Sequence, residues 1–385
     1  MKIRFFDHII VTALTMLLLG VLLWLSFNIK FLSPIAHAVR DFSLSDMYYQ
    51  IDWDSDRPME YSSDVVIVDI TKLYDRDEIA NVVDMVKDCS PKAIGVDVIF
   101  EKKSYDEAAD ALLMEVADSS GAVFAKKLTD YHNDTFNSQV RSFFVSDGVK
   151  DGFTNAAGDM STKCVREFRL METLDNVPQY SLVSQVAELY DSTATVEDKT
   201  LNYRINYRRL EFSVIGCDDV YENRELLKDK LVLIGMMSEE SDMHLTPLGK
   251  IPGLKILAYS IQTVLEKKNI KTIDDGSLMA LSVIICFITV LWQFYWIRFI
   301  GSRKSFMGVL LSNSTLFSSF LTFIWLALIA WITYVVYEKY DYNIPMAMIL
   351  APVVLVAEGR NLYASVVKAY SRTMPGGIFE NSLYN

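Results

Sequence analysis

A stretch with no charged side chain, between Asp7 and Lys30, most restricts what this chain can fold into. Its letters IIVTALTMLLLGVLLWLSF are almost all apolar, and about 20 such residues in a helix span a hydrocarbon core of about 30 Å. A cleaved signal peptide is the alternative, because Ala36-His37-Ala38 has the small-x-small form of a cleavage site. The apolar run is longer than the usual signal core of about 7–15 residues. This length favours an uncleaved membrane anchor.

Three more apolar runs lie in the last third of the chain. The first covers residues 276–297, and the second predicts a helix over about 315–337. The third, residues 344–357, reaches the length of a membrane span only if its helix continues past Glu358. The sequence therefore predicts four transmembrane helices, one near the N-terminus and three near the C-terminus.

Charge divides the chain in the same way. Residues 26–277 hold 28 Lys and Arg against 44 Asp and Glu, whereas the other residues hold 9 and 5. An acidic block of this kind argues against nucleic-acid binding, which requires a basic surface. The expected divisions are an N-terminus with the first transmembrane helix (1–29), an exported α/β domain (30–275), three transmembrane helices (276–358) and a short cytoplasmic tail (359–385).

The orientation follows from the short basic segments. Lys2 and Arg4 precede the first span, residues 298–304 carry three basic side chains, and the tail is basic as well. With four crossings these segments share one side, which the positive-inside rule makes cytoplasmic. We therefore predict a multi-pass protein of the bacterial inner membrane, with both termini cytoplasmic and residues 30–275 in the periplasm.

The exported block opens with alternating strand and helix patterns. Short β-branched runs predict strands, and apolar residues at helical spacing predict the helices between them. Alternation of this kind with short links predicts a mixed, partly parallel βαβ sheet of the α/β class. The expected strands are 64–70, 92–100, 122–128 and 230–235, with further strand-like pieces at 152–156, 165–173 and 201–207. The expected helices are 76–89, one capped by Ser104, 181–189 and 254–268.

Motifs for metals and catalysis are not found in the sequence. The acidic alternation Asp52–Asp56 resembles the start of a calcium loop, but Arg57 and Ser63 occupy its sixth and twelfth positions. A solvated acidic linker is the better interpretation. Ser241, Asp242 and His244 are adjacent in one loop, and adjacent side chains do not generally converge as a catalytic triad. We expect no metal, no cofactor and no enzymatic activity.

Three of the four cysteines lie in the exported block. Because their number is odd, at most one bridge can form within the chain. Cys164 and Cys217 are the candidate pair, and Cys286 lies in a membrane helix.

Several segments together resemble a known family, the second class of CHASE domains. They are DVVIVDI at 64–70, PKAIGVDVIFE at 91–101 with Asp106, DGFTNAAGD at 151–159 with Arg166, the helix from Ser181, KLVLIG at 230–235, and the tract from Asp242 through Thr246-Pro247 to Pro252-Gly253. The resemblance implies an extracellular sensory module of the kind associated with cyclases and histidine kinases, with one span before it and three after. About 27 residues follow Glu358, so we expect a stand-alone form without a cytoplasmic effector domain.

The candidate site lies where parallel strands are expected to end. Asp69 and Asp97 lie near the ends of predicted strands, and Asp242 follows the strand that ends at Gly235. Ligands bind at the carboxyl ends of strands in open α/β sheets, where three carboxylates could hold a cation or orient an amine or water. Alternatively, they cap helices and bind loop amides. Asp97 in particular, within an apolar strand, is expected to satisfy buried donors.

The resemblance adds further candidates to this site. Arg166 could pair with Asp159 or receive an anion. The full candidate ligand-binding set is Asp69, Asp97, Asp106, Asp159, Arg166, Asp242 and Thr246.

These observations favour a membrane sensor that detects a ligand or an envelope condition and reports to a separate partner. The alternative is a non-catalytic scaffold subunit of an envelope complex. Besides the lipid bilayer, we expect a protein partner, bound through the transmembrane helices, the exported domain or the 359–385 tail; a homo-oligomer is also possible. In the tail, an extended end with Phe379 follows Pro375-Gly376-Gly377 and is available for contact.

Overall fold

The computed structural model describes the chain apart from residues 1, 29–43, 133–134, 146–147, 156, 159–163, 195–197, 239, 269, 302–314, 341, 374–378, 380–381 and 383–385. The chain forms two compact units. One comprises residues 1–45 and 272–385, here called the membrane unit, and the other comprises residues 46–271, here called the sensory unit. Each unit has buried apolar clusters of its own.

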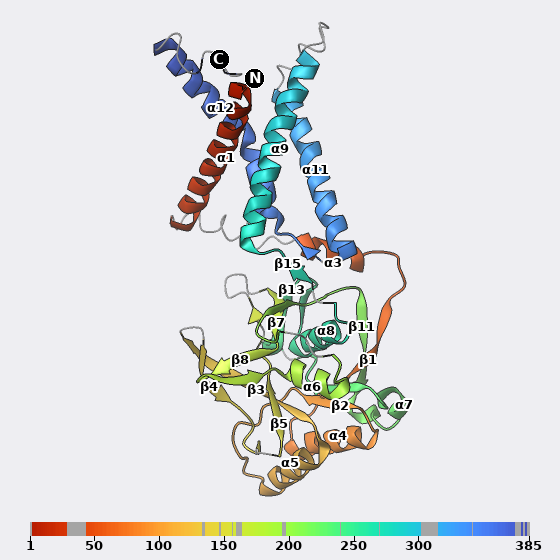
Figure 1. Ribbon diagram of the computed structural model, residues 1–385. Helices are drawn as coiled ribbons and strands as arrows, with labels where there is room; N and C mark the ends of the chain where they lie inside the picture. The colour runs from red at the N-terminus through yellow and green to blue at the C-terminus, as the bar shows by residue number, and fades with distance from the viewer. Residues whose placement is uncertain are drawn as a thin grey trace. The chain divides into compact units, whose positions relative to one another are not determined.

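The membrane unit contains four helices that are long and apolar enough to cross a bilayer. Their apolar spans match the four runs predicted from the sequence (Figure 1). The last helix continues past Glu358, which is the condition under which a fourth span was expected. The helices are α1 (Lys2–Asn28), α9 (Asp275–Gly301), α11 (Thr315–Tyr340) and α12 (Met346–Thr373).

Helices α1 and α12 pack closely. A Cβ atom added to Gly359 would collide with Oγ1 of Thr15, so the absence of a side chain lets the two backbones approach. Small residues serve this purpose at helix contacts in membranes. Val11 of α1 and Val356 of α12 are buried in one apolar cluster with Cys286 of α9.

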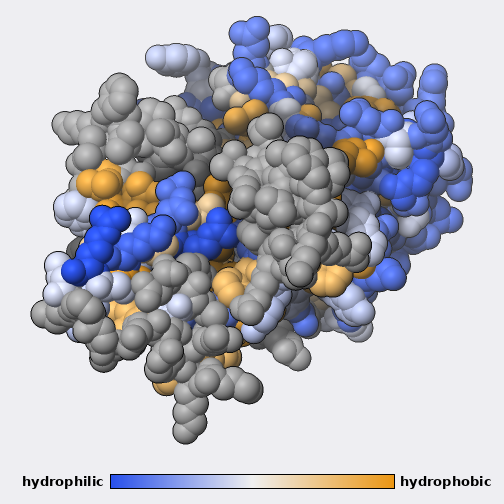
Figure 2. All heavy atoms as spheres, turned by 90° about the horizontal axis from the view of Figure 1, so that it is seen from above, coloured by the Kyte–Doolittle hydropathy of each residue, from blue (hydrophilic) through white to orange (hydrophobic). Residues whose placement is uncertain are grey.

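Much of the apolar surface of these helices is open. Leu17, Trp24, Phe323 and Trp331 are each more than half exposed. In the view from above, hydrophobic side chains (orange) lie at the surface beside hydrophilic ones (blue) (Figure 2). Lipid-facing side chains account for such exposure, because a bilayer, unlike water, solvates them favourably.

The sensory unit is built around one mixed sheet. Its central strands β11, β1, β12, β2 and β3 are parallel neighbours in that order. Strand β5 pairs parallel with β3, and β4 pairs antiparallel with it. The strands are β1 (Glu60–Asp69), β2 (Ala93–Val96), β3 (Val123–His132), β4 (Thr135–Val140), β5 (Lys150–Phe153), β8 (Met171–Leu174), β9 (Val177–Tyr180), β11 (Leu210–Gly216) and β12 (Leu231–Gly235). The sheet is the predicted mixed, partly parallel one.

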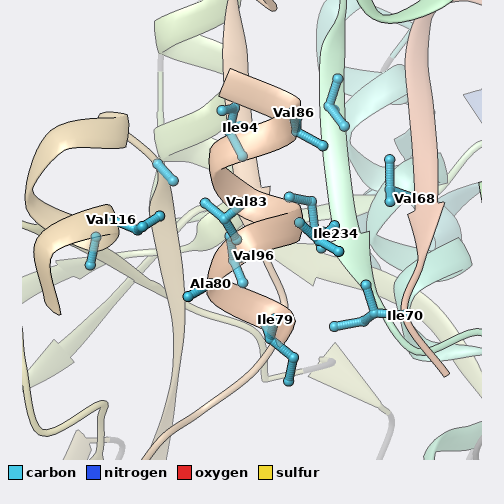
Figure 3. Close-up of a cluster of buried hydrophobic side chains, with 14 of the residues drawn as sticks. Val68, Ile70, Ile79, Ala80, Val83, Val86, Ile94, Val96, Val116 and Ile234 are labelled. Carbon is cyan, nitrogen blue, oxygen red and sulfur yellow. The ribbon is translucent and has the colours of Figure 1, made fainter. Parts of the chain in front are cut away.

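Helices cover both faces of this sheet, as fully apolar parallel strands require. On one face α4 (Arg76–Asp88) and α5 (Glu107–Ser120) direct side chains such as Val83 and Val116 onto Ile94 and Ile234 of the strands (Figure 3). On the other face lie α6 (Leu182–Tyr190) and α8 (Gly253–Leu265).

Smaller elements complete the sensory unit. Strand β7 is central in a second, three-stranded sheet, and β13 and β14 form a hairpin. These elements are α3 (Leu44–Trp53), β6 (Ala157–Gly158), β7 (Val165–Arg169), β10 (Asn202–Arg204), η1 (Cys217–Asp219), α7 (Arg224–Leu227), η2 (Glu240–Asp242), β13 (Met243–Thr246) and β14 (Gly249–Pro252). Two short strands, β15 (Lys271–Thr272) and β16 (Tyr342–Asn343), lie outside these sheets.

Three local expectations are wrong. Strand β2 ends at Val96: the N–H of Asp97 still bonds to Ile234 of β12, but the N–H of Phe100 bonds to Oγ of Ser142 instead of to a neighbouring strand. Asp106, and not Ser104, caps α5. The acidic segment before the domain is no solvated linker, since Asp52 ends up only 7% exposed, accepting a hydrogen bond from the N–H of Arg209 at 3.0 Å.

The proposed disulfide is not formed either. Cys217 is buried in the main apolar cluster, whereas Cys164 pairs through its backbone with Leu245. Burial also raises the pKa of the Cys217 thiol, so the thiolate that disulfide exchange requires is disfavoured there.

Candidate functional site

A cavity of about 90 Å³ lies within the sensory unit. Its walls come from β7, from β13, from the first turns of α6 and α8, and from the residues that follow β2 and β5. It is roomy enough for several water molecules, because one needs about 10–15 Å³ measured in this way. The polar side chains that line it are Asp97, Thr154, Asn155, Glu167, Arg169, Ser181, Asp242, His244 and Ser260.

The parallel sheet places this cavity at its carboxyl edge. Asp97 is the first residue after β2, and Phe153 is the last residue of β5. In open α/β sheets this edge is where ligands bind, because the chain turns away there and leaves a crevice. The cavity therefore occupies the position that strand topology favours for a ligand.

Asp97 is held firmly by its neighbours. Its N–H donates to the carbonyl of Ile234 on β12 at 2.8 Å. Beside it, a side chain at Gly235 would crowd its neighbours, since an added Cβ would lie 2.9 Å from Cδ1 of Leu254 and 3.3 Å from Cβ of Asp97. The close approach of β12 to α8 thus fixes where the Asp97 carboxyl emerges.

The carboxyl group of Asp97 itself is half-buried and, in the described part of the chain, makes no hydrogen bond or ion pair. The expectation that it satisfies buried donors is therefore wrong. The pKa of Asp97 is raised to about 7, mainly by burial and to a smaller extent by the nearby charge of Asp242, while His244 opposes the shift. Such perturbed carboxyls in clefts are candidates for functional groups.

Asp242 and His244 form a pair on the opposite wall. Oδ1 of Asp242 lies 3.2 Å from Nε2 of His244, and its Oδ2 accepts from the N–H of Gly253 at 3.1 Å. That second bond caps the start of α8, where negative charge is favoured by the helix dipole. The hydrogen bond to Asp242 raises the pKa of His244, although burial opposes the shift.

Asp69 does not reach this cavity. Its Oδ1 accepts from the N–H of Thr71 at 2.9 Å and from the N–H of Met237 at 3.2 Å. It therefore binds loop amides, the structural alternative to a ligand role. Of the three carboxylates expected to converge, the structure brings together Asp97 and Asp242.

Asp106 and Thr246 also have local structural roles. Asp106 accepts from the N–H groups of Ala108 and Ala109, both at 3.0 Å, at the start of α5. The hydroxyl of Thr246 donates to the carbonyl of Gly249 at 2.8 Å, within the turn of the β13–β14 hairpin. Neither residue lines the cavity.

Arg166 points away from the cavity, although it lies next to it. Its neighbours on β7, Val165 and Glu167, both line the cavity, whereas Arg166 does not. On the far face the guanidinium of Arg166 pairs with Asp46 of α3, with Nη2 2.6 Å from Oδ2. The expected partner Asp159 lies outside the described residues.

Sequence reasoning missed most of the polar lining. Glu167 and Arg169 both follow Arg166 on β7 and are two residues apart, so the period-2 rule for strands could have identified them as sharing a face. Ser260 lies within an apolar helix pattern and gave no such signal. Whether these residues bind a ligand stays a prediction.

A known protein family matches this chain. The family model described as the CHASE2 domain matches residues 14–299. No curated protein and no solved structure was found to match. The match covers most of the chain, including the whole sensory unit, and the model describes a sensory domain of the CHASE type. The chain therefore belongs to the CHASE2 domain family.

Proposed function

We propose that this protein is a multi-pass membrane sensor whose cavity at Asp97 detects a small ligand or an envelope condition. It reports through the membrane helices to a separate partner and catalyses no reaction. The observation that carries the proposal is the cavity at the carboxyl edge of the sheet, with a carboxyl that has no partner among the described residues. A pocket with convergent polar groups is typical of a ligand site, which favours the sensor over the scaffold alternative.

The wall of the cavity offers a route for the signal on the C-terminal side. Helix α8 contributes Ile256, Leu257 and Ser260 to the lining, and the chain continues from it, through residues 266–274, into α9. A ligand that shifts α8 therefore acts on the segment that leads directly to a membrane helix.

The N-terminal side offers a second route. Helix α3 lies between the first membrane span and β1 in the sequence. It is fastened to the cavity wall by the Asp46–Arg166 ion pair on β7 and by the hydroxyl of Tyr49, which donates to the carbonyl of Ile205 at 3.2 Å. Ile205 itself lines the cavity. Of the two chain connections to the membrane unit, one thus starts from a helix that lines the cavity and the other from a helix that contacts its wall.

The orientation of the protein is part of the proposal. The basic segments before α1, between α9 and α11 and after α12 fit the cytoplasmic side of a bacterial inner membrane. The sensory unit is then periplasmic. Its acidic charge argues against a nucleic-acid partner.

The tail is less available to a partner than its sequence suggests. The ring of Phe379 packs edge-on against Tyr363 and Tyr370, and the hydroxyl of Ser382 donates to Asp7 at 3.2 Å. Tyr363 also donates to Asp7, at 2.6 Å. A partner that binds the tail must therefore displace these contacts or use other residues of it.

The test fills the cavity with a larger side chain and measures which proteins copurify with the full chain. Thr154, which lines the cavity from the loop after β5, is replaced by Phe; Ser119→Phe, on the exposed side of α5, is the matched control. Full chains are purified from native membranes, and copurifying proteins are quantified by mass spectrometry. We expect the amount of at least one partner to change for Thr154→Phe alone. Identical partners in identical amounts for all three proteins would support the scaffold alternative.

A further inference from the structure

Most polar groups around the cavity are already engaged within the protein. The hydroxyl of Ser260 donates to the carbonyl of Ile256 at 2.9 Å, and Oγ of Ser181 accepts from the N–H of Ser184 at 3.0 Å. The amide of Asn155 bonds at both ends to the backbone of Leu128. These groups shape the cavity and leave little capacity for a ligand.

The positive groups are engaged as well. The guanidinium of Arg169 pairs with Glu172 at 2.8 Å and also bonds to Asn202. His244 pairs with Asp242. A negatively charged ligand would therefore have to compete with existing partners for each positive group.

Two carboxyls remain without a partner. Within the described residues, neither Asp97 nor Glu167 takes part in a hydrogen bond or an ion pair through its side chain. A partly buried carboxylate without a partner is costly, and a positive charge within hydrogen-bonding distance removes much of that cost. The cavity therefore favours a ligand that carries a positive charge and donates hydrogen bonds.

The remaining lining is apolar. Phe153, Phe168, Ile256 and Leu257 contribute aromatic and aliphatic surface. Apolar surface of this kind suits a short hydrocarbon chain. A coordinated metal ion fits less well, because the described residues bring together no three metal-ligating side chains.

We propose that the cavity binds a small organic cation, a primary ammonium group on a short aliphatic body, with Asp97 and Glu167 as its acceptors. The inference rests on the sensory function proposed above and names the ligand class for that site. An ammonium group donates up to three hydrogen bonds, which matches two carboxyls, and the volume of about 90 Å³ limits the body to a few carbon atoms.

Binding should depend on pH. The pKa of Asp97 is about 7, so the carboxylate that pairs with the ammonium forms only as the pH rises through that value. The other charged groups that line the cavity are Glu167, Arg169, Asp242 and His244. The hydrogen bond to Asp242 raises the pKa of His244, and its protonation as the pH falls adds positive charge and acts in the same direction. Affinity should therefore fall up to about tenfold per pH unit below pH 7.

The experiment uses the full chain in nanodiscs of zwitterionic lipid, with n-butylamine as the probe. Butan-1-ol and butyrate are neutral and anionic controls of similar shape, and γ-aminobutyrate is the zwitterionic control. Isothermal titration at pH 8 should show saturable binding of the amine and at least tenfold weaker binding of the others. Asp97→Asn should weaken amine binding by at least tenfold, and Glu167→Gln should weaken it less.

Asp54→Asn, at an exposed position, serves as the matched control and should bind as the parent chain does. Equal affinity for butan-1-ol, tighter binding of the zwitterion, unchanged binding by Asp97→Asn, or no binding of n-butylamine at all would each overturn the proposal. The experiments distinguish a wrong ligand class from a wrong sensory function. If amines do not bind but Thr154→Phe still changes the partners, the ligand class is wrong and the sensory function stands.

Discussion

Replacing Asp97 by Asn should change how the stability of the sensory unit depends on pH. In the folded chain the pKa of Asp97 is about 7, against about 3.9 in an unfolded peptide. The folded state therefore holds this proton more strongly, so the stability contributed by the group is complete below about pH 4. It is lost as the pH rises through 7. Asn has a similar shape but does not ionise, so its contribution stays constant.

The magnitude follows from the size of the shift. One pH unit within this window corresponds to about 1.4 kcal/mol, so between pH 5 and pH 8 the parent loses up to about 2.7 kcal/mol that the Asp97→Asn variant keeps. Solvent in the cavity screens the charge, and the observed difference should therefore be about 1–2.5 kcal/mol. Comparing two pH values removes the constant cost of burying an amide in place of a carboxyl.

Pulse proteolysis in urea measures this quantity on the full chain in nanodiscs, because the protease cleaves the unfolded sensory unit. The parent midpoint should fall from pH 5 to pH 8 relative to that of Asp97→Asn. The exposed control Asp54→Asn should follow the parent within about 0.5 kcal/mol. Parallel pH profiles for parent and Asp97→Asn would refute the reasoning, since Asp97 would then titrate as a solvated group.

Three more predictions concern other parts of the chain. Arg166→Ala leaves a half-buried carboxylate without its guanidinium and should lower the unfolding free energy of the sensory unit by about 1–3 kcal/mol in the same urea assay. Gly359→Leu should lower the thermal midpoint of the nanodisc protein, because overpacking costs about 1–3 kcal/mol, whereas Gly20→Leu, with open space around it, should not. An impermeant thiol reagent should label Asn137→Cys from outside intact cells but not Gly301→Cys, and the reverse pattern would invert the proposed orientation.

The membrane spans could be predicted from the sequence because the signal is physical and local. A bilayer requires about 20 apolar residues in a row, and the chain offers such runs with very few charges. The end of α12 depended on more than hydropathy, since the helix continues through Glu358 and Arg360 into a basic, amphipathic segment. Because the apolar run before Glu358 is too short for a span, a membrane helix there had to continue past Glu358, and it does.

The central strands β1 and β12 were also predictable, because residues 65–68 of β1 and all of β12 are buried and form continuous apolar runs. Strand β11 was missed although its apolar and polar residues alternate, a pattern typical of a strand with one covered face. Helix α3 was missed for a different reason. Its acidic side chain Asp52 is buried against a residue far along the chain, Arg209, and a local sequence pattern does not reveal such a contact.

At the candidate site, the place of a residue in the sequence does not by itself say whether its side chain faces the cavity. The topological rule for parallel sheets selected the region after β2, where Asp97 lines a cavity. Arg166 was chosen from the resemblance, by its place in the sequence, and it does not line the cavity although its neighbours on β7 do. Its pairing with Asp46 is nevertheless informative, because that pair joins the far face of the cavity wall to the helix that follows the first membrane span. A ligand that moves β7 therefore has to move or break this ion pair, and the residue that does not touch the ligand becomes the one best placed to transmit its presence.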